Sequence, residues 1–303
     1  MEIVFWKLEI KFMINIYEQI ASNKRQSFGI ISLFLIFIIG AVYFISQATN
    51  NPELVPIAIL FSAGSSLVSY FAGDKIVLGL NGAKPASRKE FFDFYTVTEN
   101  LSQAAQIPVP KIYVIESEAM NAFATGRDPD HAVICATTGL LSKLNRTELE
   151  GVIGHELSHI KNYDIRLMTI VSILIGTLSI LINMSWRLNS GNNDRDNKNS
   201  GIFMIIGLIL IIFAPIIAQL IQLAISRRRE FFADASSVSI THQPSGLISA
   251  LKKLQNDTSK ADFASTATAS LYISNPFKGN KLASMFSTHP PLEDRIKTLE
   301  AML

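Results

Sequence analysis

Residues Gly151–Asp164 read GVIGHELSHIKNYD and place two histidines four positions apart, with a glutamate directly after the first. On an α-helix, positions i and i+4 lie one above the other, so His155 and His159 can direct ring nitrogens at one metal ion. Zinc favours such ligands. Glu156 lies about 100° further round the helix than His155, so its carboxylate can reach a water beside the ion without ligating the ion. The alternative is a chance H-E-x-x-H on a surface helix.

A catalytic zinc site needs a third protein ligand and an open position for water. The candidates are His131, His242, His289 and the acidic residues. In the stretch SRRREFFADASS, Glu230 and Asp234 share one helix face at i, i+4 spacing. Glu230 can ligate the metal, and Asp234 can accept a hydrogen bond from a ligand imidazole and so fix its tautomer. The alternative is that both acids only pair with the neighbouring arginines.

The elements that must position these residues can be predicted from local patterns. TELEGVIGHELSHIKN predicts a helix in which Thr147 is the N-cap and Glu150 completes a capping box. A further helix is predicted at Phe91–Gln106. The single cysteine, Cys135, excludes an intrachain disulfide and is expected to be a buried side chain in a strand. Three short strands are predicted, at Lys111–Ser117, Met120–Gly126 and His131–Gly139.

The chain as a whole is too apolar for an average soluble protein. Of its 303 residues 49% are hydrophobic and 17% are charged, and the mean hydropathy is +0.29. The absence of ionisable side chains in the longest apolar stretches argues against a channel or transporter. The net charge of +2, without a basic cluster, does not indicate nucleic-acid binding. Four segments approach the length of about 20 residues that crosses a bilayer, namely Phe28–Ile45, Leu54–Ala72, Leu167–Trp186 and Gly201–Ile225.

Basic residues near the ends of these spans predict the orientation, because Lys and Arg favour the cytoplasmic side. Lys24 and Arg25 precede the first span, three arginines follow the fourth, and the connection between the first two spans has none. The loop between the last two spans opposes the rule weakly. We therefore expect both termini and the long middle segment in the cytoplasm. The chain then divides into an N-terminal cytoplasmic segment (1–27), a transmembrane hairpin (28–72), the first half of a soluble domain with the H-E-x-x-H helix (73–166), a second hairpin (167–225) and the second half of that domain (226–303).

Six blocks of the sequence resemble, in the same order, those of the HtpX-type membrane zinc metalloproteases. This family is related to the CAAX prenyl protease and to the mitochondrial inner-membrane protease Oma. The blocks are YEQIASNKRQS, MNAFATG, TTGLL, GVIGHELSHIKNYD, SRRREFFADASS and THPPLEDRI. The resemblance begins at about Tyr17 and continues to the C-terminus, while residues 1–12 lie outside it.

The resemblance implies a role for each residue of the site. His155, His159 and Glu230 would ligate one Zn²⁺ per chain, and Glu156 would be the catalytic base and acid. His289, in THPPLEDR, would donate a hydrogen bond to the developing oxyanion, since protease relatives use the corresponding His-Pro block beside their site.

Three further residues are expected to bind the substrate backbone. Met120–Gly126 suits an edge strand, which can pair with an extended peptide, and Asn121 and Ala122 would then flank the scissile bond. The alternative is an interior strand of the sheet. Arg295 can support His289 or bind substrate backbone.

The expected fold is mainly α and integral to the membrane, with a small β-sheet. It comprises four transmembrane helices and one cytoplasmic zincin-like metalloprotease domain built from two chain segments. The expected function is that of a multi-pass zinc endopeptidase of the prokaryotic inner membrane, which cleaves misfolded or membrane polypeptides in quality control and stress response. Its partners would be those polypeptides, the lipid bilayer and other membrane quality-control proteases, without nucleic acid. The alternative is a catalytically inactive membrane scaffold that retains the zinc site.

Overall fold

The computed structural model of the protein describes residues 2–49, 52–174, 176, 227–259, 261, 268, 271–274 and 290–303. The first two predicted spans, Phe28–Ile45 and Leu54–Ala72, lie within these residues. The third, Leu167–Trp186, is described only in its first part, and the fourth, Gly201–Ile225, lies outside the described residues.

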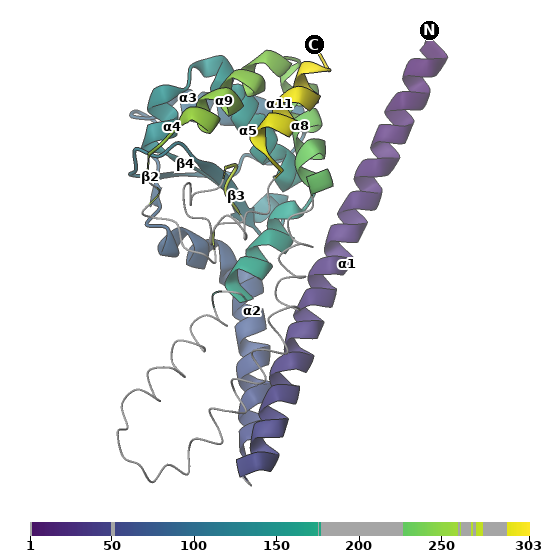
Figure 1. The fold of residues 1–303 in the computed structure, drawn as a ribbon, viewed down its shortest axis with the longest axis vertical. Coiled ribbons are helices and arrows are strands. Elements are labelled where there is room, and N and C mark those ends of the chain that lie inside the picture. Colours follow the sequence, from purple (N-terminus) through teal and green to yellow (C-terminus); the bar gives the residue numbers. More distant parts are fainter. Residues whose placement is uncertain are drawn as a thin grey trace.

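Two long helices extend from the rest of the molecule and run side by side (Figure 1). They are α1 (Glu2–Thr49) and α2 (Leu54–Leu80). A helix rises 1.5 Å per residue, so the 27 residues of α2 reach about 40 Å, more than the roughly 30 Å of a hydrocarbon core. Within the described part of the chain, the segment Val55–Leu80 is the one helix long and apolar enough to cross a membrane, judged by length and composition.

α2 continues past Ala72, where the predicted second span ends, because its contacts there favour an unbroken helix. A side chain at Gly73 would lie 2.7 Å from the Thr169 side chain, so the glycine lets the helix approach its neighbour closely. The helix ends where the Asn81 side chain donates a hydrogen bond of 2.7 Å to the carbonyl of Val77 and Gly82 takes a φ of 63°. A positive φ is favourable for glycine and incompatible with a continuing helix.

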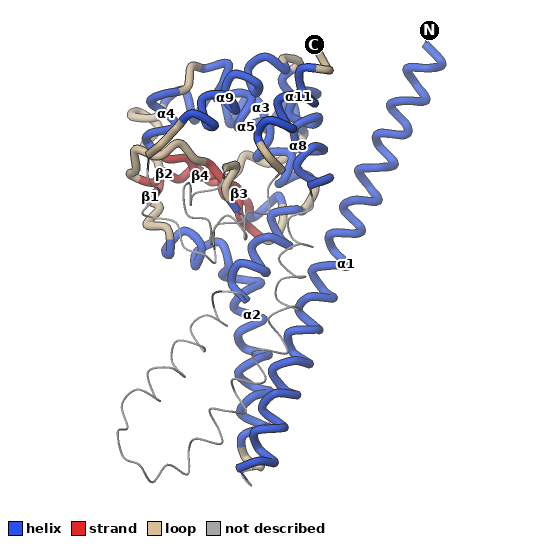
Figure 2. The backbone as a smooth tube through the Cα atoms, viewed as in Figure 1, coloured by secondary structure: helices blue, strands red, loops and turns tan. Residues whose placement is uncertain are grey.

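A small mixed sheet lies between the end of α2 and the shorter helices (Figure 2). Its strand order is β1-β2-β4-β3, so β3 is an edge strand. β2 and β4 are parallel, and the other two pairs are antiparallel. The strands are β1 (Lys84–Pro85), β2 (Lys111–Ile115), β3 (Ala122–Gly126) and β4 (Ala132–Thr137).

The helix that carries the H-E-x-x-H sequence, α5 (Arg146–Lys161), is the centre of the main hydrophobic core. Val152, Ile153 and Leu157 on this helix are fully buried against the surrounding helices and one face of the sheet. The other face of the sheet, which includes Cys135, packs on the end of α2. The helices around α5 come from two segments that are far apart in the sequence. The first segment contributes α3 (Phe92–Ala105) and α4 (Thr138–Lys143), and the second contributes α8 (Arg227–Thr241), α9 (Pro244–Asn256) and α11 (Leu292–Glu300).

Most predicted elements of this region are confirmed, with one error at the start of α5. The predicted helix at Phe91–Gln106 is α3, the three predicted strands are β2, β3 and β4, and Cys135 is buried in β4. The capping box, however, lies two residues earlier than predicted: Asn145 and Glu148 form it, in place of Thr147 and Glu150. Glu148 is favoured there because it is buried and also accepts hydrogen bonds from Ser249 and Lys253.

Candidate metal centre and active site

The site is built where α5 and α8 approach each other closely. Gly154 on α5 faces Ser237 on α8, and a side chain at position 154 would lie only 2.8 Å from the Ser237 hydroxyl. That hydroxyl instead donates a hydrogen bond of 2.7 Å to the carbonyl of Gly151. Because the two helices approach so closely, polar side chains from both of them can reach one common point.

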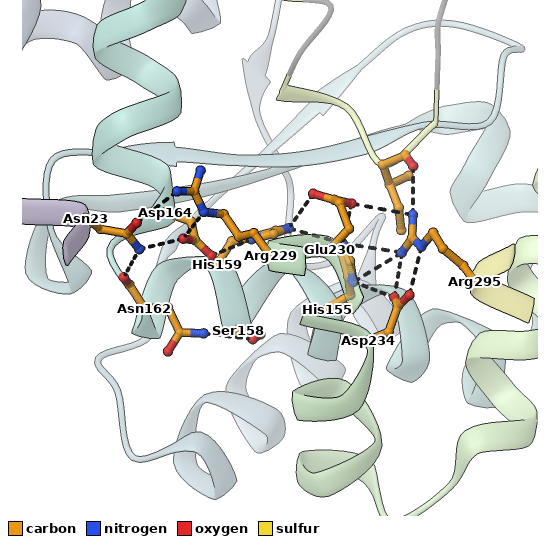
Figure 3. A network of polar contacts seen from close by, with 11 residues as sticks. Asn23, His155, Ser158, His159, Asn162, Asp164, Arg229, Glu230, Asp234 and Arg295 are labelled. Atoms are coloured by element: carbon orange, nitrogen blue, oxygen red, sulfur yellow. Dashed lines mark hydrogen bonds and ion pairs between the residues drawn. The ribbon is translucent and has the colours of Figure 1, made fainter. Parts of the chain in front are cut away.

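Two histidines of α5 and one glutamate of α8 direct their ligand atoms at a common point (Figure 3). The Nε2 atoms of His155 and His159 are 3.1 Å apart. Glu230 places its Oε2 3.7 Å from the Nε2 of His155 and its Oε1 3.6 Å from the Nε2 of His159. All three side chains are buried, and one ligand atom from each lies within 4.8 Å of the others.

This donor set fits a zinc ion. Two ring nitrogens bound tetrahedrally at 2.0–2.1 Å are about 3.3 Å apart, close to the separation of the two Nε2 atoms here. In both histidines the other ring nitrogen, Nδ1, faces a carboxylate, so Nε2 is the nitrogen that can bind a metal. The two Nε2 atoms and the Glu230 carboxylate face each other in a buried site, an arrangement that favours a bound cation between them.

Glu156 adds a second carboxylate to this site. Its side chain is 1% exposed, and its Oε2 has no hydrogen-bond partner among the described residues. Burial raises the pKa of the Glu156 carboxyl, and the nearby charges of His155, His159 and Arg295 oppose that rise. The arrangement suits a group that has to take up and release a proton.

His155 is oriented by Asp234, as the i, i+4 pattern of α8 suggested. Its Nδ1 lies 2.9 Å from Asp234 Oδ1. Burial and the positive charge of Arg295 both lower the pKa of His155, but hydrogen bonds to Asp234 and Glu230 outweigh them and raise it to about 9. A metal that binds Nε2 must therefore displace a proton.

Arg295 of α11 holds Asp234 in place. It is fully buried, and its Nε and Nη2 donate to the two carboxylate oxygens of Asp234 at 2.8 and 2.6 Å. Burial by itself would raise the pKa of Asp234, but the Arg295 charge outweighs it and the pKa is lowered. Arg295 Nη1 also donates to the main-chain carbonyl of Ile273 at 3.2 Å. This is main chain of the protein itself, so the two predicted roles of Arg295, support of His289 or binding of substrate backbone, stay predictions.

The partner of the other histidine, Asp164, was missed by sequence reasoning. Asp164 Oδ2 accepts from His159 Nδ1 at 2.9 Å, and its Oδ1 lies 2.8 Å from Arg229 Nε and 2.7 Å from Asn23 Nδ2 (Figure 3). Asp164 returns to the site because Tyr163 adopts a φ of 60° after the end of α5. The signal in the sequence was an aspartate five residues after His159, within the stretch GHELSHIKNYD.

Asn23 connects this centre to α1. It is 1% exposed, and besides Asp164 its amide donates to the carbonyl of Asn162 at 2.8 Å and accepts from Arg229 Nη2 at 2.9 Å. A residue in the first long helix is therefore two hydrogen bonds away from a candidate metal ligand.

The edge strand β3 lies beside the site. Its outer edge, the one that does not pair with β4, contacts residues 271–274 of the same chain. Ile273 donates its N–H to the carbonyl of Ala122 at 3.0 Å. The Asn121 side chain donates to the carbonyl of Ser274 at 3.0 Å and accepts from the Ser274 N–H at 3.4 Å. Asn121 and Ala122 thus hydrogen-bond to main chain of the protein itself, and their expected contact with a substrate stays a prediction.

Two of the remaining candidates for a third ligand, His131 and His242, do not join the cluster. His131 is exposed and lies 2.6 Å from Asp128, and His242 is exposed after the end of α8. His289 lies outside the described residues, so its expected role stays a prediction.

Comparisons with known proteins extend over nearly the whole chain. The crystal structure of S. mikatae Ste24p shares 21% identity at a TM-score of 0.49, with 90% of this chain and 65% of that chain covered. A protein of Streptococcus uberis named Protease HtpX homolog is 42% identical over 296 residues, which cover 95% of this chain and 100% of the relative. A protein of the same name from Caldanaerobacter subterraneus subsp. tengcongensis is 44% identical over 295 residues, with 95% and 98% covered.

The family itself is identified by its sequence profile. The profile of Peptidase family M48 matches residues 89–303, which is more than half of the chain and contains both α5 and α8. Together with the two relatives that are more than 40% identical, this match shows that the chain belongs to peptidase family M48 and is a metalloprotease.

Proposed function

We propose that the protein is a membrane-embedded zinc endopeptidase with one Zn²⁺ per chain, which cleaves misfolded or membrane polypeptides in membrane protein quality control. Its protease domain and both termini would face the cytoplasm of a prokaryotic cell. His155, His159 and Glu230 would ligate the metal. Glu156 would be the catalytic residue.

The observation that carries the proposal is the convergence of three buried ligand side chains beside a buried glutamate. The Nε2 atoms of His155 and His159 face each other and the carboxylate of Glu230. Glu156 has an oxygen without a partner among the described residues at the same place. An inactive scaffold has no need to retain a buried carboxylate of this kind, because an unpartnered buried polar atom lowers stability.

Zinc, when bound, would acidify a water molecule and polarise the scissile carbonyl. The chain's own residues would do the rest. Glu156 would accept the proton of the attacking water and deliver it to the leaving nitrogen. Asp234 and Asp164 would keep the two imidazoles in the tautomer that leaves Nε2 free. The substrate would lie as an added strand along β3, with Asn121 and Ala122 bound to its backbone.

The proposed membrane location is supported by α2. Its surface carries large apolar side chains that are more than half exposed, among them Leu60 (75%) and Leu67 (59%). Exposed apolar side chains along a helix of this length suit a lipid environment. The four spans are proposed from the four uncharged segments, and the cytoplasmic orientation from the lysines and arginines at their ends.

The experiment that tests the proposal compares Glu156→Gln with the wild type. The variant keeps all three ligands, so it should keep zinc, but it should lose turnover by about 10²–10⁴-fold because the base is removed. A matched control is Glu150→Gln on the same helix, since Glu150 is partly exposed and its ion-pair partner among the described residues is Arg146, outside the metal cluster. The measurement is cleavage of an unfolded protein such as casein by the purified full chain, alongside its zinc content.

Removal of the metal gives a second arm. We expect 1,10-phenanthroline to abolish cleavage and added zinc to restore it, because ligand exchange is reversible. A Glu156→Gln protein that cleaves casein at the wild-type rate would contradict the assignment of the base. A wild-type protein that holds zinc but cleaves no polypeptide would favour the scaffold.

A further inference from the structure

A second polar site lies apart from the metal cluster, where the end of α2 meets the turn between β3 and β4. It is a cavity of about 200 Å³, many times the 10–15 Å³ or so that a single buried water needs. Its walls come from α2, from that turn and from the helical residues 164–174. Its polar lining consists of Ser69, Asp74, Lys75, Lys111, Arg127 and Arg166, together with the hydroxyl of Thr169 and the ring of His131.

The cavity is basic. Two lysines and two arginines line it, and two carboxylates oppose them: Asp74 in the lining and Asp128, whose Oδ2 lies 3.5 Å from Arg127 Nε. Four cations minus two anions give a net charge of +2 with histidine neutral. Lys75 and Lys111 are exposed, and within the described part of the chain neither of them has an ion-pair partner. An excess of positive charge around one concave site indicates an anionic ligand.

The two arginines are held in place by aromatic rings. The Arg166 guanidinium lies 5.6 Å from the ring centre of Tyr70 and 4.9 Å from that of Tyr163, and its Nε donates to the carbonyl of Arg127. Arg127 in turn lies 5.4 Å from the ring centre of Phe71. Guanidinium groups fixed in this way present N–H donors in a rigid, planar arrangement that matches the oxygens of a phosphate group.

A buried hydroxyl in the wall also lacks a partner. Ser69 is 1% exposed, and its Oγ makes no hydrogen bond among the described residues. Serine in a helix usually returns such a bond to the preceding turn, so the Ser69 hydroxyl is a donor without an acceptor in a residue of the cavity wall. This observation is independent of the charge of the cavity.

The position of the cavity along α2 indicates which phosphate it binds. From Leu54 to Ala72 the helix has no charged residue, and Asp74 and Lys75 are its first. If α2 crosses the membrane, as the proposed function requires, the cavity lies at the level of the lipid headgroups. Basic pockets at this level beside membrane helices bind anionic headgroups. We propose that the cavity binds the headgroup phosphate of an anionic phospholipid in the cytoplasmic leaflet.

The test measures binding of dihexanoyl phosphatidylglycerol, a short-chain soluble lipid, to the full-length protein in a neutral detergent. The double variant Lys75→Gln/Lys111→Gln removes two charges that make no ion pair. A lysine near an anionic surface is worth roughly fivefold in affinity, so the pair should weaken binding about 30-fold. The matched control is Lys89→Gln/Lys297→Gln, which removes the same charge from exposed positions outside the cavity. It should bind the lipid as the wild type does.

Two further arms separate the alternatives. Ser69→Ala should weaken lipid binding while it leaves the melting temperature of the lipid-free protein unchanged or higher, because it deletes an unpaired polar atom. Inorganic phosphate should compete only at far higher concentration than the lipid. Equal lipid affinity in the double variant and the control would overturn the proposal. Equal competition by inorganic phosphate would replace the lipid with a soluble anion. None of these readouts depends on peptidase activity, so a failed protease assignment is detected separately.

Discussion

Asp164→Asn is the perturbation that tests most directly how the site is built. The change keeps the shape of the side chain and removes its charge. Asp164 is 0% exposed and accepts from three donors: His159 Nδ1, Arg229 Nε and Asn23 Nδ2. An asparagine has only one acceptor oxygen, so its NH₂ group must face a donor in either orientation. If it faces His159, the imidazole has to move its proton to Nε2, the atom that is needed for the metal.

The magnitude follows from these contacts. Loss of a carboxylate that orients a metal-bound histidine typically costs 10–100-fold in metal affinity, or about 1.4–2.8 kcal/mol. In addition, Arg229 loses a buried counter-ion, and breaking a buried ion pair typically costs about 3–5 kcal/mol of folding free energy. We therefore expect weaker zinc binding and a lower melting temperature together.

The assay is competition for zinc between the purified protein and a fluorescent chelator, after circular dichroism has shown that the variant is folded. Asp257→Asn is the matched control, because Asp257 accepts from Met120 N and Lys143 Nζ and does not contact the metal cluster. It should lower stability and leave zinc affinity unchanged. A folded Asp164→Asn protein whose zinc affinity stays within threefold of the wild type would refute this reasoning. So would an equal loss of affinity in Asp257→Asn.

Three other predictions concern the third ligand, the membrane topology and the carboxylate of Asp257. Glu230→Ala should empty the site, since three ligands become two, whereas Asp234→Asn should cost only about 10–100-fold in zinc affinity; the reverse order would exchange their roles. A reporter fused after Leu303 should read as cytoplasmic and one inserted at Asn193 as external, and an external C-terminus would place the protease domain on the other side. Burial would raise the pKa of Asp257, but its hydrogen bonds, first that from the Met120 N–H, outweigh burial and lower it from 3.8 to about 2. Its stabilisation is therefore complete above the unfolded value and is lost as the pH falls towards 2, so acid unfolding monitored by circular dichroism should be less steep in Asp257→Asn.

The parts of the site that could be predicted are those with a local pattern. The i, i+4 spacing placed His155 and His159 on one face of α5, and the same spacing placed Glu230 and Asp234 on one face of α8. Spacing alone left open whether Glu230 ligates, because the approach of α8 to α5 depends on a contact between Gly154 and Ser237, which are far apart in the sequence.

The parts that were missed depend on backbone geometry or on distant pairs. Asp164 reaches His159 only because Tyr163 has a positive φ, which is uncommon for a residue with a bulky side chain. Asn23 meets Asp164 across 141 positions of sequence. The start of α5 was misplaced by two residues because Asn145 and Thr147 are both acceptable caps, and only the buried partners of Glu148 decide between them.

The contact between β3 and residues 271–274 would lower the apparent affinity of any substrate that binds as an added strand. Such a peptide must take over the carbonyl of Ala122 from Ile273 and the side chain of Asn121 from Ser274. The apparent affinity is then the intrinsic affinity multiplied by the fraction of molecules in which the strand edge is vacant. Long unfolded chains, which offer many backbone groups in succession, can compensate for this competition. A short loop on a folded protein offers too few, so with the proposed binding mode the protein's own backbone would favour unfolded chains over folded ones.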